Sequence, residues 1–277
     1  MVDIRKIAIA VSTVCFLGAS QSAKGEEPIG ARDFDCVMES RVVVKLGTAV
    51  TGLISSVTVE RGDFVKEGQV VAQLDADVQR AIVALARAKA TNEYQILSHR
   101  SRREFLTKKL ERVQTLQKKD FASVAALDEA VADAKVVENA EKEAELNRLI
   151  AKLELEREEA TLNQRVIRSP INGVVTERVL FSGEYRNETN HLMTIAQIDP
   201  LNIEVVLPIS YYGQISLGGE AEVTPEAPVG GKYKAKVVVV DRVLDAASGT
   251  FGVRLELPNN RNELPAGIRC MVRFAKK

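Results

Sequence analysis

Hydrophobic and polar positions alternate in two separate stretches of the chain, residues 41–75 and 166–199. Both stretches are rich in Val, Ile and Thr and are divided by glycine-containing turns, a pattern typical of short β-strands. The residues between these two stretches have a different composition. From Gln69 to Ser169 there is neither glycine nor proline, and Ala, Leu, Glu, Lys, Arg and Gln predominate. These residues favour helix, so the sequence predicts a long helical segment inserted into a β-domain.

Within the helical segment, apolar residues recur at spacings of three and four, which indicates amphipathic helices. The residues expected to form the seam between two helices are Val78, Ala81, Ile82, Leu85, Ala88, Leu106, Leu110, Val113 and Leu116, then Val124, Leu127, Val131, Ala134, Leu146, Leu149, Leu153 and Ala160. The segment 119–123 lies near the midpoint, and Asp120 and Ser123 are both suited to cap a helix there. We therefore predict a hairpin of two matched arms, each of roughly 42 residues and roughly 60 Å long.

Charge supports this hairpin. Residues 76–118 carry ten Lys/Arg and four Asp/Glu, whereas residues 123–165 carry six Lys/Arg and eleven Asp/Glu. A basic arm folded against an acidic arm is self-complementary, as in coiled coils. Each exposed pair contributes only about 0.2–1 kcal/mol, so charge selects the pairing more than it stabilises it. Because the chain has a formal net charge of zero and the basic arm has an acidic partner, we expect no nucleic-acid binding.

The two β-rich stretches repeat one pattern. The first copy begins at Gly52 and has a second glycine at Gly62; the second copy begins at Gly173 and has its second glycine at Gly183. An acidic residue follows the second glycine in each copy, and the copies end in Ala-Gln-Leu-Asp and Ala-Gln-Ile-Asp. An internal repeat of this kind predicts one small β-domain made of two similar halves. The four glycines are expected to supply turns and close backbone approach.

Beyond Pro200 the chain contains more short strand-like runs, which are separated by turns rich in glycine and proline. They are residues 201–207, 220–224, 233–243, 250–257 and 269–274. Short antiparallel strands at this spacing predict a small β-barrel, to which residues 29–40 add a strand near Phe34.

The N-terminus has the features of an export signal. Arg5 and Lys6 precede an apolar stretch of thirteen residues, Ile7 to Ala19, and small residues follow. We predict a signal peptide over residues 1–23. A lipid on Cys15 and an uncleaved anchor are the alternatives.

Two cysteines remain after this segment, Cys36 and Cys270. In an oxidising compartment they can form a disulfide between the first and last strands of the barrel, or they can stay as buried thiols.

Catalytic chemistry has little support in the sequence. The chain has two histidines, His99 in the helical segment and His191 in a turn, and no nucleophile is paired with either. Gly230-Gly231-Lys232 lacks the other residues of a phosphate-binding loop, and the cysteines do not have zinc-ligand spacing. We expect no enzymatic activity, no cofactor and no metal site.

A β-domain built from two such halves resembles the biotinyl/lipoyl carrier fold, with the lysine-bearing hairpin replaced by the helical insertion. With a small β-barrel after it, the chain resembles the periplasmic adaptor (membrane fusion) subunits of tripartite efflux pumps. The resemblance implies a mixed α and β, multi-domain fold. Its expected parts are a lipoyl-like domain (barrel-sandwich hybrid; residues 41–75 plus 166–199), an antiparallel coiled-coil α-hairpin (76–165) and a β-barrel domain (29–40 plus 200–277).

The expected hairpin tip, near residues 112–123, carries a more specific motif. Family members that work with resistance-nodulation-division pumps have Arg-x3-Leu-x6-Ser at the tip, and Arg112, Leu116 and Ser123 have this spacing. The resemblance implies that these residues bind an outer-membrane channel protein. Arg112 would bond to carbonyls or carboxylates of the channel, Leu116 would pack into a groove between its helices, and Ser123 would hold the turn. The residue types alone also fit an ordinary helical corner with a solvated Arg, a seam Leu and a cap Ser.

The resemblance further implies a periplasmic protein that joins an inner-membrane transporter, most simply of the resistance-nodulation-division type, to the channel. Copies would form a ring, commonly a hexamer, for the export of small molecules. The chain resembles a short adaptor without the membrane-proximal domain of many relatives. Three alternatives stay open: an adaptor of an ATP-driven exporter or secretion system, an exported coiled-coil interaction protein, and an acyl or biotinyl carrier.

Overall fold

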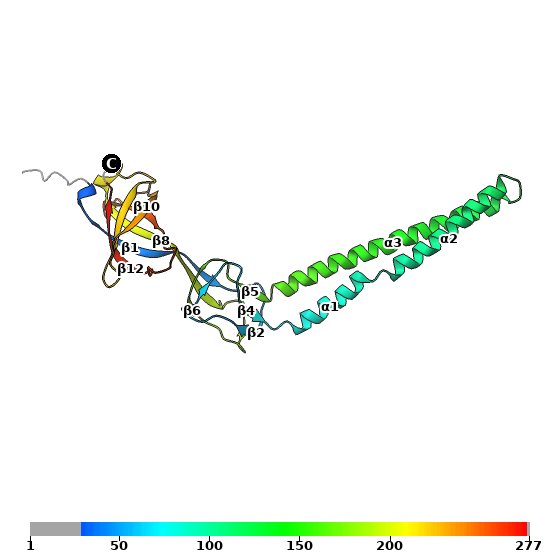
Figure 1. Cartoon of the computed structure of the whole chain (residues 1–277), viewed down its shortest axis with the longest axis horizontal. Coiled ribbons are helices and arrows are strands. Elements are labelled where there is room, and N and C mark those ends of the chain that lie inside the picture. Colours follow the sequence, from blue (N-terminus) through cyan, green and yellow to red (C-terminus); the bar gives the residue numbers. More distant parts are fainter. Residues whose placement is uncertain (1–28, 276–277) are drawn as a thin grey trace, which may run out of the picture.

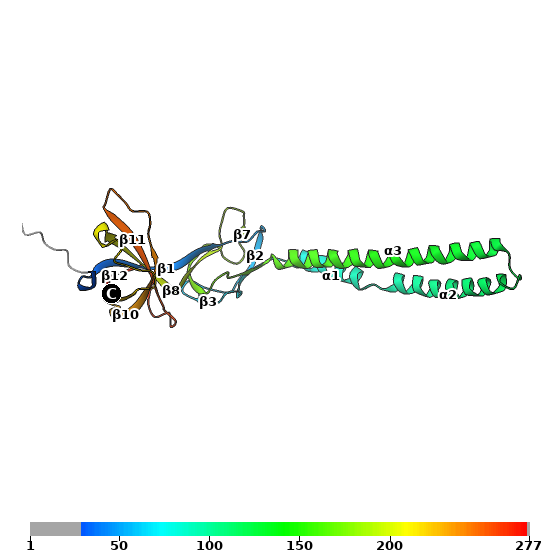
Figure 2. The same ribbon diagram turned by 90° about the horizontal axis from the view of Figure 1, so that it is seen from above.

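The structure, a computed structural model, describes residues 29–275. The predicted signal peptide and Cys15 lie outside these residues. The molecule is elongated, with a β-barrel at one end, a smaller β-domain in the middle and a helical hairpin that projects away from both (Figure 1; Figure 2). The predicted fold class is confirmed: a closed β-barrel, a barrel-sandwich hybrid domain and a helical hairpin follow one another along the long axis.

The barrel consists of six antiparallel strands in the order β1-β12-β9-β10-β11-β8, and it closes because β8 also pairs with β1. The strands are β1 (Phe34–Leu46), β8 (Met193–Pro208), β9 (Glu220–Pro225), β10 (Tyr233–Val240), β11 (Thr250–Leu257) and β12 (Ile268–Phe274), with short 3-10 helices η1 (Ile29–Ala31) and η2 (Ile209–Tyr211). Along β8, Leu201, Ile203, Val205 and Leu207 are buried in alternation with more exposed neighbours. This period of two fills the barrel interior.

Strands β1 and β8 are long enough to belong to both β-domains. They pair from Cys36↔Val205 in the barrel to Leu46↔Met193 in the middle domain, and the register shifts between Ser40 and Val42 at the junction. Each side of the junction has its own hydrophobic core. Two continuous paired strands therefore connect the domains.

The middle domain contains the two halves that the repeat predicted. Its further strands are β2 (Gly52–Val57), β3 (Phe64–Val65), β4 (Val70–Leu74), β5 (Val166–Arg168), β6 (Gly173–Arg178) and β7 (Tyr185–Arg186). The halves exchange strands symmetrically, because β3 of the first half pairs with β6, and β7 of the second half pairs with β2.

Backbone hydrogen bonds repeat this exchange at equivalent positions. The N–H of Gly62 donates to the carbonyl oxygen of Val175 at 2.8 Å, and the N–H of Gly183 donates to that of Ile54 at 2.8 Å. Ile54 and Val175 each stand two residues after the first glycine of their copy, and each is 1% exposed. The sequence repeat is thus a repeat of contacts around one shared core.

The acidic residue after each second glycine also has one role in both halves. Asp63 Oδ2 accepts a hydrogen bond from the backbone N–H of Glu60 at 2.7 Å, and Glu184 Oε2 accepts one from that of Phe181 at 2.9 Å. Each carboxylate closes the turn that precedes it.

The four predicted glycines divide into three kinds. Gly62 and Gly183 have φ values of +97° and +89°, which favour glycine in a turn. Gly173 is the first residue of β6, and a Cβ there would lie 2.4 Å from the carbonyl oxygen of Ala196. Gly52, the first residue of β2, has no such requirement for glycine. Its φ is not positive, and a Cβ there would lie 3.4 Å from its nearest neighbour, Arg165 Nη1, which is an ordinary contact distance. The turn assignment is therefore wrong for Gly52 and Gly173, which lie in strands.

The helical insertion forms a hairpin of three helices, α1 (Asp77–Thr91), α2 (Tyr94–Gln117) and α3 (Val124–Asn163). Among the described residues, no helix combines the length and apolar character needed to cross a membrane. The second arm is one continuous helix, as predicted, but the first arm is broken between α1 and α2, so the expectation of two matched helices is wrong (Figure 1).

Polar groups satisfy the backbone at this break. Asn92 is extended (ψ 112°), and its Oδ1 accepts a hydrogen bond from the N–H of Tyr94 at 3.1 Å. From α3, Arg148 Nε donates to the carbonyl oxygen of Ala90 at 3.4 Å, and its guanidinium pairs with Glu93. The break is thus capped from within and bridged by the opposite arm.

The seam between the arms differs from the prediction. Its buried and half-buried side chains recur in alternating steps of three and four, apart from one step of seven between His99 and Leu106. They are Val83, Ala86 and Ala90 in α1; Ile96, His99, Leu106, Leu110, Val113 and Gln117 in α2; and Leu127, Ala130, Ala134, Val137, Glu141, Ala144, Arg148, Ala151 and Leu155 in α3. Of the predicted seam, Leu106, Leu110, Val113, Leu127 and Ala134 are confirmed. Val78, Ile82, Leu85, Val131, Leu146, Leu149 and Leu153 instead face outward, as does Leu116. Alanines form much of the true seam, because a close helix pair follows a 3.5-residue period and accepts small side chains.

One seam position holds a buried charge. Glu141 is 3% exposed and pairs with Arg103 at 3.0 Å and with Arg100 at 3.2 Å, both from α2. A buried carboxylate is costly without such partners. This cluster therefore favours one register of α2 against α3.

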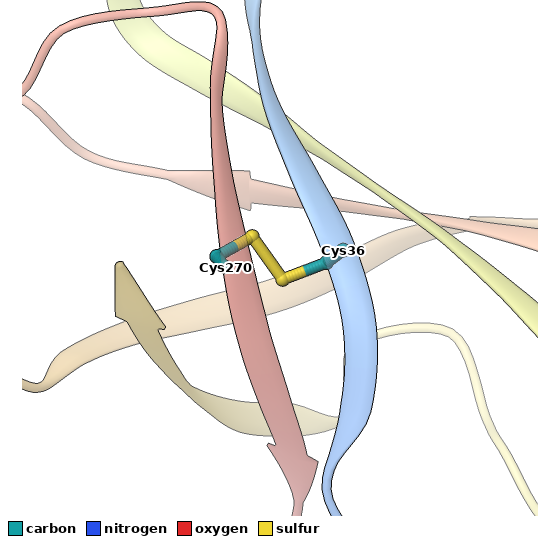
Figure 3. Close-up of a disulfide and its surroundings, with 2 residues drawn as sticks. All are labelled: Cys36 and Cys270. Atoms are coloured by element: carbon teal, nitrogen blue, oxygen red, sulfur yellow. A yellow bond between two sulfur atoms is a disulfide. The ribbon is translucent and has the colours of Figure 1, made fainter. Parts of the chain in front are cut away.

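The predicted cysteine pair forms a disulfide in the structure (Figure 3). Cys36 in β1 lies directly opposite Cys270 in β12, with the Cα atoms 4.9 Å apart, and both residues are buried. The bond joins the first and last strands of the barrel and spans 234 positions of sequence.

Replacing Gly173 by Ala should lower the free energy of unfolding by about 1–3 kcal/mol, because the new methyl group would overlap backbone. Gly52→Ala, at the equivalent position of the other half, is the matched control and should change stability little. Urea denaturation of the two purified variants measures the difference. Equal stability of the two would contradict the close approach at Gly173.

Replacing both Cys36 and Cys270 by Ala should lower the free energy of unfolding by about 2–5 kcal/mol, as expected for loss of a disulfide that closes a long loop. Non-reducing mass spectrometry of the exported wild-type protein should show no alkylatable thiol in residues 29–275. Two alkylated cysteines would contradict the bond.

Candidate functional site

The far end of the hairpin is a tight turn between α2 and α3. Asp120 adopts the left-handed conformation with φ 58°. Its N–H donates to the carbonyl oxygen of Gln117 at 3.0 Å, and the N–H of Phe121 donates to that of Leu116 at 2.9 Å. These two bonds define a Schellman motif, which satisfies the last carbonyls of α2.

The first turn of α3 is fixed by Ser123. Its Oγ accepts a hydrogen bond from the N–H of Ala126 at 3.2 Å, so Ser123 is the N-cap, while Asp120 belongs to the end of α2. The tip is thus bounded by a C-terminal motif on one side and an N-cap on the other.

The three predicted tip residues have different surroundings. Arg112 and Leu116 lie one turn apart on the same face of α2, and both are exposed, Leu116 by 40%. Leu116 lies beside the seam, whose nearest members are Val113 and Gln117, so the idea of a seam leucine is wrong. The Ser123 hydroxyl is used by the helix cap. The structure therefore leaves Arg112 and Leu116 available for a partner and gives Ser123 a role in the turn.

Ion pairs between the arms stop short of the tip. Lys109 pairs with Asp133 at 3.1 Å, and near the base Arg87 pairs with Glu159 at 2.6 Å. Within residues 29–275, Arg112, Lys118 and Lys119 make no ion pair or side-chain hydrogen bond with another residue, so their charges face solvent at the end of the hairpin.

Further from the tip, one carboxylate of α3 is held by lysines of its own helix. The Lys142 and Lys135 ammonium groups bond to Glu138 and lower its pKa to about 2, so this carboxylate stays ionised.

Phe121, which the sequence analysis did not select, is also at the tip. It is 77% exposed, and the neighbouring Val124 is 64% exposed. The sequence signal is a large aromatic residue inside a polar turn, flanked by Asp120 and Ala122.

Large apolar side chains also form two exposed rows on the lower half of the hairpin. The α1 row is Val78, Ile82 and Leu85, and the α3 row is Leu146, Leu149, Ile150 and Leu153; each side chain is at least 40% exposed. The ion pair Arg87–Glu159 and the contact of Arg148 with Ala90 bring these parts of α1 and α3 to the same level. Because both rows lie off the seam, they offer two different apolar surfaces to other molecules.

The described residues contain no group of His, Cys, Asp or Glu arranged to hold a metal ion. The surface of the hairpin instead presents unpaired cationic side chains at the tip and exposed apolar side chains at the tip and in the two rows. Such a surface suits protein recognition.

Comparison with known proteins agrees with this architecture. Residues 42–197 match the family model of a CzcB-like barrel-sandwich hybrid domain, and residues 201–277 match a CusB-like β-barrel domain. An uncharacterized protein of Haemophilus influenzae is 22% identical over 233 residues, which are 83% of this chain and 53% of that protein. The chain thus spans about half the length of this curated relative.

Solved structures show the same fold. MacA from Actinobacillus actinomycetemcomitans superimposes with a TM-score of 0.73 at 20% identity, covering 88% of this chain and 78% of MacA. A MacA-MexA chimera that contains the Pseudomonas aeruginosa MexA α-hairpin domain gives a TM-score of 0.56 at 19% identity, covering 89% and 82%. With the family models matching more than half of the residues, the chain belongs to the membrane fusion (periplasmic adaptor) protein family, whose members are non-enzymatic adaptors.

Proposed function

We propose that this protein is the periplasmic adaptor of an efflux pump. It would link an inner-membrane transporter to an outer-membrane channel and form a ring-shaped conduit for small molecules. The observation that carries this proposal is the hairpin itself. It projects away from both β-domains and ends in exposed residues, of which Arg112 has no ion pair within the described part of the chain (Figure 2).

Contact with the channel is assigned to the tip. The Arg112 guanidinium can donate charge-assisted hydrogen bonds to carbonyls or carboxylates on the helix ends of the channel. Leu116, one turn away on the same face, would pack into the groove between those helices. Ser123 supports both by holding the first turn of α3.

Ring assembly is supported by the two exposed rows. The α1 row of one copy would pack against the α3 row of the next. A contact that uses two different surfaces is heterologous, and it closes into a ring when the rotation between copies allows. The copy number, commonly six, comes from the resemblance to the family.

The opposite end of the molecule is assigned to the transporter. The barrel lies at the far end from the hairpin tip, and the chain enters the barrel there at η1 (Figure 1). This placement suits a protein whose N-terminal export signal leads to the inner membrane. A resistance-nodulation-division transporter is the partner that the Arg-x3-Leu-x6-Ser spacing favours.

Arg112→Asp should abolish export while leaving fold and expression unchanged, because the exposed side chain supports no core and the new charge repels acceptor groups on the channel. Arg102→Asp is the control, since Arg102 is an exposed residue of the same helix below the tip. Export is measured as cell growth in a panel of toxic compounds. Normal growth of the Arg112 variant would refute the tip assignment.

Leu85→Asp and Leu149→Asp should each prevent ring formation, because a buried carboxylate would be placed between adjacent hairpins. Chemical crosslinking of concentrated purified protein, resolved by native mass spectrometry, gives the copy number. Val243→Asp, at an exposed position of the barrel, should assemble as the wild type does. Closed rings from both hairpin variants would exclude these rows as the interface.

A further inference from the structure

Phe121 lies in the turn at the tip, and 77% of its surface is exposed. Leu116, the residue whose carbonyl accepts the N–H of Phe121, is 40% exposed. In a Schellman motif the side chains at these two positions commonly meet. Here Phe121 stays mostly exposed and Leu116 partly so, and the turn therefore presents apolar surface at the end of the hairpin far from the β-domains.

The turn that holds Phe121 is formed at a conformational cost. A left-handed φ of 58° at Asp120 is unfavourable for a residue with a side chain, although Asp tolerates it better than most. Two backbone bonds on one side and the Ser123 cap on the other maintain the turn. An aromatic side chain on such a fixed turn loses little conformational freedom when it binds.

The charges beside it indicate the kind of surface that it fits. Lys118 and Lys119 lie in the turn just before Asp120, both are exposed, and neither has an ion-pair partner within the described chain. A partner with an apolar pocket and acidic groups at its edge would match this arrangement. A lipid surface fits less well, because one aromatic side chain and two lysines give only weak membrane binding.

We propose that Phe121 is the anchor residue of the tip and inserts into an apolar pocket of the outer-membrane channel, with the two lysines facing acidic groups at the edge of the pocket. The proposal rests on the proposed function and adds to it a residue outside the Arg-Leu-Ser spacing. Arg112 would orient the contact, while Phe121 would supply most of the apolar surface that becomes buried.

The test compares Phe121→Ala and Phe121→Tyr with the wild type in cells. A photoreactive residue at Val124, which is 64% exposed beside the turn and has no part in the proposed contact, reports capture of the channel as crosslinking yield. Phe105→Ala is the matched control, because Phe105 is 68% exposed on α2 but lies below the tip. We expect Phe121→Ala to lower the yield by roughly 30-fold, as for truncation of an interface hot spot. Phe121→Tyr and Phe105→Ala should retain the yield.

Three results would overturn the proposal. Equal capture by Phe121→Ala and wild type would exclude the anchor role while leaving the adaptor function in place. No capture by the wild type would contradict both. Phe121-dependent sedimentation of the purified protein with vesicles of phosphatidylethanolamine and phosphatidylglycerol would assign the tip to lipid.

Variants of Asp120 test the geometry of the turn with Phe121 intact. Asp120→Gly keeps the left-handed conformation and should retain capture. Asp120→Val disfavours it, because a β-branched residue rarely adopts positive φ, and should lower capture. Wild-type capture by Asp120→Val would show that the presentation of Phe121 by this turn is unimportant.

Discussion

The pairing of β4 with β5 is the constraint on which the rest of the molecule depends. These strands flank the helical insertion on its two sides, and they lie next to each other because each belongs to one half of the repeated β-domain. The N–H of Leu74 donates to the carbonyl oxygen of Arg165 at 2.9 Å, and Arg165 Nη1 donates to that of Asp75 at 2.5 Å. Both arms must therefore start from one point and run antiparallel, and this directs the tip away from the barrel.

Side chains of different size lie on different faces of this hairpin. Small and charged residues fill much of the seam, and the buried Glu141 with its arginine partners contributes more to register than to stability. Large aliphatic residues such as Leu149 and Leu153 face outward. An isolated hairpin of this composition leaves apolar surface in water, and assembly with other copies would cover it. The same exposed residues are those that the proposed ring would bury.

Much of the fold could be predicted from the sequence, because the repeat places equivalent glycines where equivalent contacts form. The seam could not, since the large apolar residues of α1 and α3 also recur at helical spacing, and periodicity does not distinguish a face that packs within the chain from one left for a partner. Asn92 was a signal for the break in the first arm, but only the contact with Arg148 shows how the other arm bridges it. At the tip, the motif spacing located Arg112 and Leu116. Phe121 required the geometry of the turn, because exposure of an apolar residue cannot be read from its type.

The central claim is that the hairpin tip binds an outer-membrane channel. In-cell crosslinking from a photoreactive residue placed at Leu116, with the captured partner identified by mass spectrometry, tests it most directly. The account predicts capture of an outer-membrane channel protein. Capture of other copies of this chain alone, or of no protein, would mean that the hairpin serves another purpose and would contradict the account.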